Sequence, residues 1–392
     1  MKLLFVIDGL GTGGAERSLA EMLPLLVDAG IKPSVTCLYA RHEGVAKDVA
    51  RNRVDVRLLR GNNVVSRALE LRGILSKERP DLVHTALFDA SLVGRLASAR
   101  GGPPVLTSLV STPYAPARLR DPNIGRISLE SVRLIDGWSA RHLTSHFHAI
   151  TNAVKRAAVT ALGVDPDRIT VIERGRDPGR LGSPSHERRL RTRSALGLSD
   201  EDEVIVHVGR QEFPKGHRYL VEALDRVART RPGLIVLMVG RRGHASRELD
   251  RLAGRSSAAR IRWMGHRDDV PDLLAAGDLF LFPSLFEGLG GALIEAMALG
   301  LPIIASDLEA IREVVEEGRN AVLVPPASPQ ALADAIVMLL DDRPKAATFG
   351  AHSRAIFAER FTADRSVARM IELYGEVLRQ NHHPYVDIGT AA

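Results

Sequence analysis

The sequence predicts an α/β protein made of two doubly wound domains, each built on a parallel sheet. Short apolar β-type runs alternate with helical patterns along the whole chain, as in parallel strands that are joined by helices. The chain has 392 residues, more than a single hydrophobic core usually holds. A segment rich in Gly, Pro, Ser and charged residues, 174–203, separates two halves that repeat the same pattern.

The first half is expected to alternate strands with helices from its first residues onward. The strands are Leu3–Ile7, Ser34–Tyr39, Val54–Leu59, Leu82–His84, Val105–Leu109 and Phe147–Thr151. The helices include Ala15–Ala29, Val65–Glu78 and Ala90–Ala99. Gly30 and Pro80 are of types that commonly end a helix, so they should terminate the first two of these helices.

The second half repeats the alternation. Its strands are Val204–Val208, Leu234–Val239, Ile261–Met264, Leu279–Phe282, Ile303–Ala305 and Ala321–Val324. A boundary near residue 180 gives a first domain of residues 1–180 and a second of residues 181–380, whose last helix could return to the first. Residues 381–392 break the periodicity and should form a frayed tail. Two such domains facing each other would place the carboxyl ends of their strands, where ligands bind, across a cleft.

The composition favours a soluble, cytoplasmic protein. No apolar run approaches the ~20 residues that span a bilayer, and Asp8 interrupts the first apolar run too early for a secretory signal. The single cysteine, Cys37, excludes an internal disulfide and fits a reducing compartment. One cysteine and scattered histidines also give no zinc-ligand cluster.

Positive charge is concentrated in the first half. Residues 1–180 carry 26 Lys and Arg against 18 Asp and Glu, a net charge of +8. This excess indicates either a solvated basic surface or an anionic partner, such as a phosphorylated acceptor or the inner membrane face. Nucleic acid is not expected, because aromatic residues make up only 4% of the chain. Segment 66–80 is expected to form a helix that carries Arg67, Arg72, Lys77 and Arg79, which either solvate its face or bind an anionic membrane surface.

A glycine-rich loop follows the first expected strand. Gly9, Gly11 and Gly14 form G-x-G-x-x-G, which can bring an anionic ligand to the start of the next helix. A dinucleotide site also needs an acid at the end of the second strand, where the sequence has Tyr39-Ala40-Arg41. Because Arg41 could meet a 2′-phosphate, an NADP-dependent oxidoreductase stays open as an alternative.

Two glutamates stand in the stretch LFPSLFEGLGGALIEAMALGLPIIASD, residues 281–307. Glu287 falls in the loop after a strand, and Glu295 falls in an otherwise apolar helix that follows a run of glycines. An unpaired buried carboxylate is costly, so Glu295 is expected to have a functional partner. Carboxylates at these places suit sugar hydroxyls, and the amides at the helix start suit a diphosphate.

Two cations follow the strand in VIVHVGRQEFPKGHRYLVEAL, residues 204–224. Arg210 leaves the strand end, and Lys215 stands just before Gly216. Two fixed cations at one strand edge suit the negative charge of a departing diphosphate.

With these motifs the sequence resembles the retaining glycosyltransferases of family 4, which have the GT-B fold. The segments that carry the resemblance are GTGGAERSL, VGRQEFPKG, residues 281–307 and NAVLVPPASPQALADAI, in the expected order. The resemblance implies a UDP- or GDP-sugar donor held by the second domain. It also implies a glycan, lipid-linked or small-molecule acceptor held by the first, with no metal or other cofactor.

The resemblance also implies roles for individual residues. Arg210 and Lys215 would bind the diphosphate and stabilise it as it leaves, Glu287 would hold the donor sugar, and Glu295 would bind the ribose. The remaining donor-side residues are Gly13, Gly14, Gly209, Gly265, His266, Arg267, Gly288, Leu289, Gly290 and Gly291.

The chain departs from the family pattern on the acceptor side. Where many members have a histidine in the first domain, this sequence has Leu109-Val110-Ser111, with Ser111 and Thr112 as polar substitutes. His84, at an expected strand terminus, is a separate candidate. Arg174-Gly175 replaces the usual Asn-Gly. A catalytically silent GT-B binding module therefore stays open as a second alternative.

Overall fold

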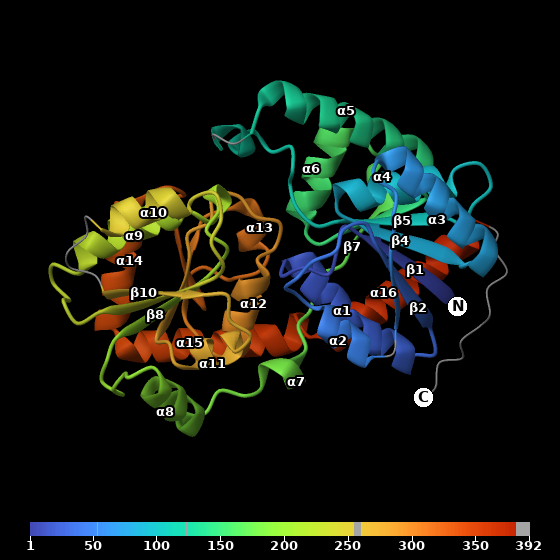
Figure 1. The fold of residues 1–392 in the computed structure, drawn as a ribbon. Helices are drawn as coiled ribbons and strands as arrows, with labels where there is room; N and C mark the ends of the chain where they lie inside the picture. The colour runs from blue at the N-terminus through green and yellow to red at the C-terminus, as the bar shows by residue number, and fades with distance from the viewer. Residues whose placement is uncertain (53, 122–123, 255–259, 382–392) are drawn as a thin grey trace. The chain divides into compact units, whose positions relative to one another are not determined.

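The computed structural model describes residues 1–52, 54–121, 124–254 and 260–381, which form two compact units. Unit 1 holds Met1–Gly175 together with the chain from Ala363 onward, and unit 2 holds Arg176–Thr362. The chain thus passes from unit 1 to unit 2 at Gly175, a few residues before the boundary expected near residue 180. It returns at Ala363, so the last helix belongs to unit 1 (Figure 1). The expected frayed tail lies outside the described residues beyond Asn381.

Unit 1 is built on a seven-stranded, fully parallel sheet of order β3-β2-β1-β4-β5-β6-β7. Its strands are β1 (Lys2–Ile7), β2 (Lys32–Cys37), β3 (Asp55–Leu58), β4 (Leu82–Ala86), β5 (Val105–Leu109), β6 (His146–Ala149) and β7 (Ile169–Val171). Its helices are α1 (Gly14–Asp28), α2 (Ala46–Arg51), α3 (Val64–Glu78), α4 (Phe88–Ser98), α5 (Arg126–Leu143), α6 (Asn152–Leu162) and α16 (Ala363–Gln380). Each strand expected in this half is present, whereas β7 escaped the sequence analysis.

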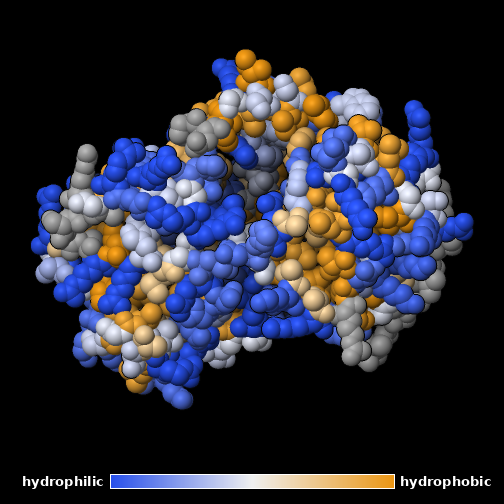
Figure 2. Space-filling view, viewed as in Figure 1, coloured by the Kyte–Doolittle hydropathy of each residue, from blue (hydrophilic) through white to orange (hydrophobic). Residues whose placement is uncertain are grey.

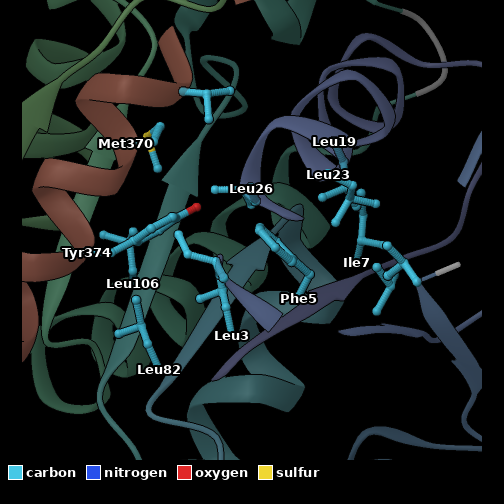
Figure 3. Packing of buried hydrophobic residues seen from close by; sticks show 14 of the residues in the cluster. Leu3, Phe5, Ile7, Leu19, Leu23, Leu26, Leu82, Leu106, Met370 and Tyr374 are labelled. Atoms are coloured by element: carbon cyan, nitrogen blue, oxygen red, sulfur yellow. The ribbon is translucent and has the colours of Figure 1, made fainter. Parts of the chain in front are cut away.

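Alternate side chains of β1 enter two different cores of unit 1, because successive residues of a strand point to opposite faces. Leu3, Phe5 and Ile7 pack in a cluster with α1 and α16, and Leu4 and Val6 pack in a second cluster with α3 and α4. Figure 3 shows the first cluster, with Leu3 and Phe5 between the α16 residues Met370 and Tyr374 on one side and the α1 residues Leu19 and Leu23 on the other. Helices therefore cover both faces of the sheet, as in a doubly wound domain.

Unit 2 has a six-stranded, fully parallel sheet of order β10-β9-β8-β11-β12-β13. Its strands are β8 (Val204–Val208), β9 (Ile235–Val239), β10 (Arg260–Gly265), β11 (Leu279–Phe282), β12 (Ile303–Ser306) and β13 (Ala321–Val324). Its helices are α7 (Pro178–Leu181), α8 (His186–Ala195), α9 (His217–Val227), α10 (Ser246–Ala253), α11 (Val270–Ala275), α12 (Gly291–Ala298), α13 (Glu309–Arg312), α14 (Pro329–Asp341) and α15 (Arg343–Arg360). The expected strands of this half are confirmed.

The segment 174–203, expected to be a linker, is ordered structure. It contains α7 and α8, and α8 is attached to the sheet by arginines. Arg193 is buried, and its Nη2 donates to Asp278 Oδ2 over 3.0 Å, while Arg189 Nη2 donates to Asp278 Oδ1 over 2.7 Å. The polar composition of this segment therefore reflects its ion pairs.

Candidate functional site

The carboxyl ends of β8 and β11, which are neighbours in the sheet of unit 2, bring two predicted donor residues into contact. Lys215 follows β8 in the 3-10 turn Phe213–Lys215, and Glu287 follows β11. Lys215 Nζ donates to Glu287 Oε2 over 2.5 Å and lies 5.5 Å from the centre of the Phe282 ring. Both side chains are partly buried, so the ammonium and the carboxylate are fixed by each other.

The approach of the Lys215 turn to the end of β11 requires a glycine. Gly216 has a φ of +65°, and a Cβ at this position would overlap the carbonyl of Pro283. The two segments are also joined by Leu285 N, which donates to Pro214 O over 2.8 Å. Gly216 therefore lets Lys215 reach Glu287.

Two buried histidines, His207 in β8 and His217 at the start of α9, flank the same turn in the sequence and contact each other. This pair was not predicted from the sequence. His207 Nδ1 donates to Leu281 O over 2.9 Å, so its Nε2 accepts from His217 Nε2 over 3.1 Å. Burial lowers the pKa of His207 to about 4 and that of His217 well below its usual range, so both rings are neutral. A Cβ at Gly209 would lie 3.1 Å from His207 Nε2. The only sequence signal was a histidine inside the apolar run VIVHV.

The glycine run after Glu287 shapes the start of α12. Gly288, Leu289 and Gly290 are buried, and Gly290 caps the helix with a φ of +90°. Gly288 N donates to Glu287 Oε1 over 3.4 Å, a long hydrogen bond. The predicted sugar-binding carboxylate and the predicted phosphate-binding amides therefore lie on one short loop.

Glu295 in α12 has the buried partners that its position requires, and both are arginines of this chain. Its Oε1 accepts from Arg176 Nε and from Arg180 Nη2, each over 2.9 Å. The Arg176 guanidinium lies against Gly291, where a Cβ would overlap it, and Arg176 is only 2% exposed. No hydrogen bond from the described residues reaches Oε2. The sequence analysis expected a partner but did not identify these two.

The remaining donor-side residues are more exposed. Arg210 is exposed, and no ion pair joins it to the described part of the chain. Arg267 forms a two-pronged pair with Asp269, of 2.7 and 2.5 Å, which holds the pKa of Asp269 below its usual value. His266 lies 3.6 Å from Asp268. Gly265 has a φ of +65°, and its carbonyl accepts from Gly240 N over 2.8 Å.

Unit 1 contains a pocket near the start of α1. Ala15 and Ser18 of α1, Arg174 and Gly175 contribute to its lining. A Cβ at Gly14 would lie 3.9 Å from Arg174 Nη1, so the glycine loop and the predicted acceptor-side arginine are adjacent. Gly13 caps α1, and a Cβ there would overlap the carboxylate of Glu16. The rest of the lining is largely apolar, with Phe5, Ile7, Leu19, Met22, Val367 and Met370.

A directed chain of hydrogen bonds crosses the floor of this pocket. His148 Nε2 donates to Ile172 O over 2.8 Å, so Ser108 Oγ donates to His148 Nδ1 over 2.8 Å. Ser108 then accepts from His84 Nε2 over 2.7 Å, and His84 Nδ1 accepts from the Tyr374 hydroxyl over 2.9 Å. Each ring has one donor and one acceptor nitrogen, both occupied. The two histidines are therefore neutral and cannot act as free bases in this arrangement.

The acceptor-side candidates are separated by the structure. His84 lies within β4, which continues to Ala86, so its expected place at a strand terminus was wrong. Ser111 and Thr112 follow β5 and do not contribute to the pocket lining, whereas His84 and Arg174 do. The sequence analysis missed Ser108, His148 and Tyr374, although His146 and His148 alternate with apolar residues in β6.

The chain matches two family models that together span both units. Residues 12–180 match Glycosyltransferase Family 4, and residues 202–342 match Glycosyl transferases group 1. The chain belongs to the family 4, group 1 glycosyltransferases. The oxidoreductase alternative is thereby removed.

Relatives of this glycosyltransferase agree in fold and class. It is 27% identical over 282 residues to an Escherichia coli UDP-Gal:alpha-D-GlcNAc-diphosphoundecaprenol alpha-1,3-galactosyltransferase, covering 70% of each chain. It is 29% identical over 309 residues to a D-inositol 3-phosphate glycosyltransferase of Xylanimonas cellulosilytica, covering 76% of this chain and 73% of that protein. Anabaena HepE in complex with UDP-glucose matches with a TM-score of 0.83 and 25% identity, over 96% of this chain and 100% of that one. The fold of the glycosyltransferase is GT-B.

Two features are absent from the described residues of the glycosyltransferase, a helix able to span a membrane and a cluster of metal ligands. No helix among them combines the length and the apolar character that crossing a membrane requires. No group of three or more His, Cys, Asp or Glu residues in the same part of the chain is arranged to hold a metal ion.

Acid is expected to destabilise unit 1 of the glycosyltransferase through its buried histidines. Burial lowers the pKa of His148 to about 4 and that of His84 well below its usual range. Between about pH 6.5 and pH 4 the unfolded chain binds more protons than the folded one, so stability falls as pH falls. For His148 alone the loss is on the order of 3 kcal/mol.

Urea unfolding followed by circular dichroism at pH 7.5 and pH 5 measures this loss. His148→Gln is the control, because its amide can keep both hydrogen bonds but takes up no proton. The variant should lose less stability than the wild type between the two pH values. Equal losses would contradict the assignment.

Proposed function

We propose that this enzyme transfers a sugar from a UDP-sugar to a hydroxyl group of a phosphate-bearing acceptor, with retention at the anomeric carbon. The observation that carries the donor half is the contact between Lys215 and Glu287 beside the glycine run that starts α12. A cation, a carboxylate and the amides of a helix start at one strand edge can hold a diphosphate and a sugar together. UDP is favoured over GDP because HepE binds UDP-glucose and the Escherichia coli relative uses UDP-Gal.

In the proposed donor site each group has one task. Lys215 and Arg210 stabilise the charge on the leaving diphosphate, and Glu287 accepts hydrogen bonds from the sugar hydroxyls. Glu295 holds the ribose through Oε2, since Oε1 is occupied by Arg176 and Arg180. Base contacts fall to the segment from Gly265 to Arg267. In the proposed site the charge of the leaving diphosphate is stabilised by these side chains, without a metal ion.

The reaction step exchanges one bond to the anomeric carbon for another on the same face. The bond from C1 to the diphosphate oxygen breaks as the acceptor oxygen attacks C1, and the acceptor proton passes to the leaving phosphate. UDP and the glycosylated acceptor are the products. Catalysis then rests on positioning and on stabilisation of the leaving group.

Arg174 supports a phosphate-bearing acceptor. It lines the pocket of unit 1, and its charge contributes to lowering the pKa of both buried histidines. With His84 and His148 neutral, the Arg174 guanidinium is the cation among the lining residues and can pair with an anion, while Glu21 is the acid of the same lining. Both named relatives act on acceptors whose names include a phosphate or a diphosphate.

A panel of UDP-, GDP- and ADP-sugars tests the proposal. A UDP-sugar should raise the melting temperature of the enzyme and should be consumed slowly to UDP even without acceptor, with NADPH as the negative control. Proton NMR of the product should show the anomeric configuration of the donor, and chelation of divalent ions should leave the rate unchanged. Binding without consumption, with or without acceptors, would instead support a silent binding module.

A further inference from the structure

Helix α5 of unit 1 has its apolar residues on the outside. Ile127 is 85% exposed, Leu134 62%, Trp138 52% and Ile135 50%. Positions i, i+7, i+8 and i+11 lie on one face of a helix, so the four side chains form one stripe along α5. We call these four residues the α5 stripe. Figure 2 shows the corresponding hydrophobic side chains gathered over α5 at the top of the view.

The buried face of α5 consists of polar and small residues, whereas a helix at a protein surface normally buries its large apolar residues. It packs on unit 1 through Asp136, Gly137, Ser139 and Ala140. Asp136 is held there by Arg95 Nη1 over 2.7 Å and by the Tyr114 hydroxyl over 2.9 Å. The helix is thus fixed to the unit by polar and small residues, while its large apolar side chains remain outside. An exposed apolar face of this kind indicates an interaction surface.

The surroundings of the α5 stripe are basic. Between residues 116 and 143 the sequence has five arginines and three acids. Two of the acids are neutralised, since Asp136 is buried on Arg95 and Glu130 accepts from Arg133 over 2.8 Å. Arg120 and Arg126 precede the stripe and are exposed, whereas Arg141, at its far end, donates through Nη1 to the carbonyl of Leu162. On the same face of α5, Glu130 and Ser131 lie between Ile127 and Leu134.

We propose that α5 docks this enzyme on an anionic lipid bilayer, with the α5 stripe among the acyl chains and its arginines at the headgroups. An apolar stripe of Ile, Leu and Trp beside basic residues is typical of helices that lie in the membrane interface. Trp138 is the last residue of the α5 stripe, and tryptophan prefers the interfacial depth. The basic rim fits anionic headgroups, whereas a neutral apolar protein surface would leave these charges unpaired.

The basic helix expected from the sequence does not offer such a face. In α3, Arg67 lies over the Tyr39 ring at 4.4 Å, so it does not share a surface with Arg72 and Lys77. Its exposed apolar residues are Val65 and Leu69, one turn apart. The α3 pair therefore provides a matched control of the same chemistry.

Vesicle co-sedimentation of the full chain tests the proposal. The vesicles contain equal parts of phosphatidylglycerol and phosphatidylcholine, or phosphatidylcholine alone, at low and high salt. The α5 variant carries Ile127→Ser, Leu134→Ser and Ile135→Ser, and the control carries Val65→Ser and Leu69→Ser. Because all five side chains are exposed, both variants should keep the wild-type melting temperature.

The wild type and the α3 control should bind anionic vesicles, and binding should weaken with salt. The α5 variant should lose at least about tenfold in the ratio of bound to free enzyme. In a Trp263→Phe background Trp138 is the single tryptophan, and its emission should shift to the blue on anionic vesicles. The proposal would be overturned if the wild type stayed in the supernatant or if the α5 variant bound as well as the wild type. It would also be overturned if only the α3 control lost binding. A wild-type dimer that the α5 variant dissociates would overturn it in favour of self-association.

Discussion

Lys215→Ala is expected to lower turnover about 10²–10³-fold at saturating donor while changing the Michaelis constant for the donor little. The ammonium of Lys215 is held at the donor edge of the sheet by Glu287. Negative charge on the diphosphate grows as the bond to the sugar breaks, so the cation stabilises the transition state more than the bound donor. Initial rates of UDP release over a range of donor concentrations separate the two constants.

Three further variants test whether the lower turnover of Lys215→Ala comes from the loss of the cation at this site. Lys345→Ala removes a half-buried lysine of unit 2 beside the Phe349 ring and should leave both constants unchanged. Lys215→Arg keeps a cation at the site and should recover part of the rate. Arg210→Ala should also lower turnover more than donor affinity. Wild-type turnover in both Lys215→Ala and Arg210→Ala would contradict the assigned role.

The strands were predictable because their signal is local. A run such as VIVHV or LFLF between turn residues indicates a buried parallel strand without knowledge of its neighbours. β7 was missed because it is three residues long, Ile169–Val171, and is stabilised by pairing with β6. The segment 174–203 was mistaken for a linker because its arginines resemble solvated charge in the sequence. Their acids, Asp272 and Asp278, lie some 85 residues further along the chain.

In the candidate site, too, the features with a local sequence signal could be predicted, and the contacts between distant residues could not. Lys215 and Glu287 could be placed together in advance, because the carboxyl ends of two strands of one sheet meet at one edge. The partners of Glu295 could not, because Arg176 and Arg180 stand 119 and 115 residues before it. The contact between Tyr374 and His84 spans 290 residues and depends on α16 lying in unit 1. The α5 stripe was not visible either, since an apolar helical pattern usually indicates the face that is buried.

Breaking the pair between Arg176 and Glu295 is expected to destabilise unit 2 strongly. Arg176→Met leaves the Glu295 carboxylate buried with Arg180 alone, and loss of one partner of a buried ion pair costs about 3–5 kcal/mol. Urea unfolding of the Trp138→Phe enzyme reports on unit 2, because Trp263 then remains as the single tryptophan and packs against the core of that unit. Arg343→Met removes an exposed arginine that pairs with Glu203 and lies 3.6 Å from Asp278 Oδ1, and it should change the free energy of unfolding by less than about 1 kcal/mol.

Glu295→Gln distinguishes a structural pair from a ribose ligand. The amide oxygen can still accept from Arg176, while the carboxylate that would hold the ribose hydroxyls is gone. The variant should therefore raise the Michaelis constant for the donor several-fold with turnover little changed, since ribose contacts alter little along the reaction. In the double variant Arg176→Met with Glu295→Gln no buried carboxylate is left, so much of the stability lost in Arg176→Met should return. A pure turnover defect in Glu295→Gln would contradict the ribose assignment, and a fully stable Arg176→Met would show that the pair is not needed to hold α12.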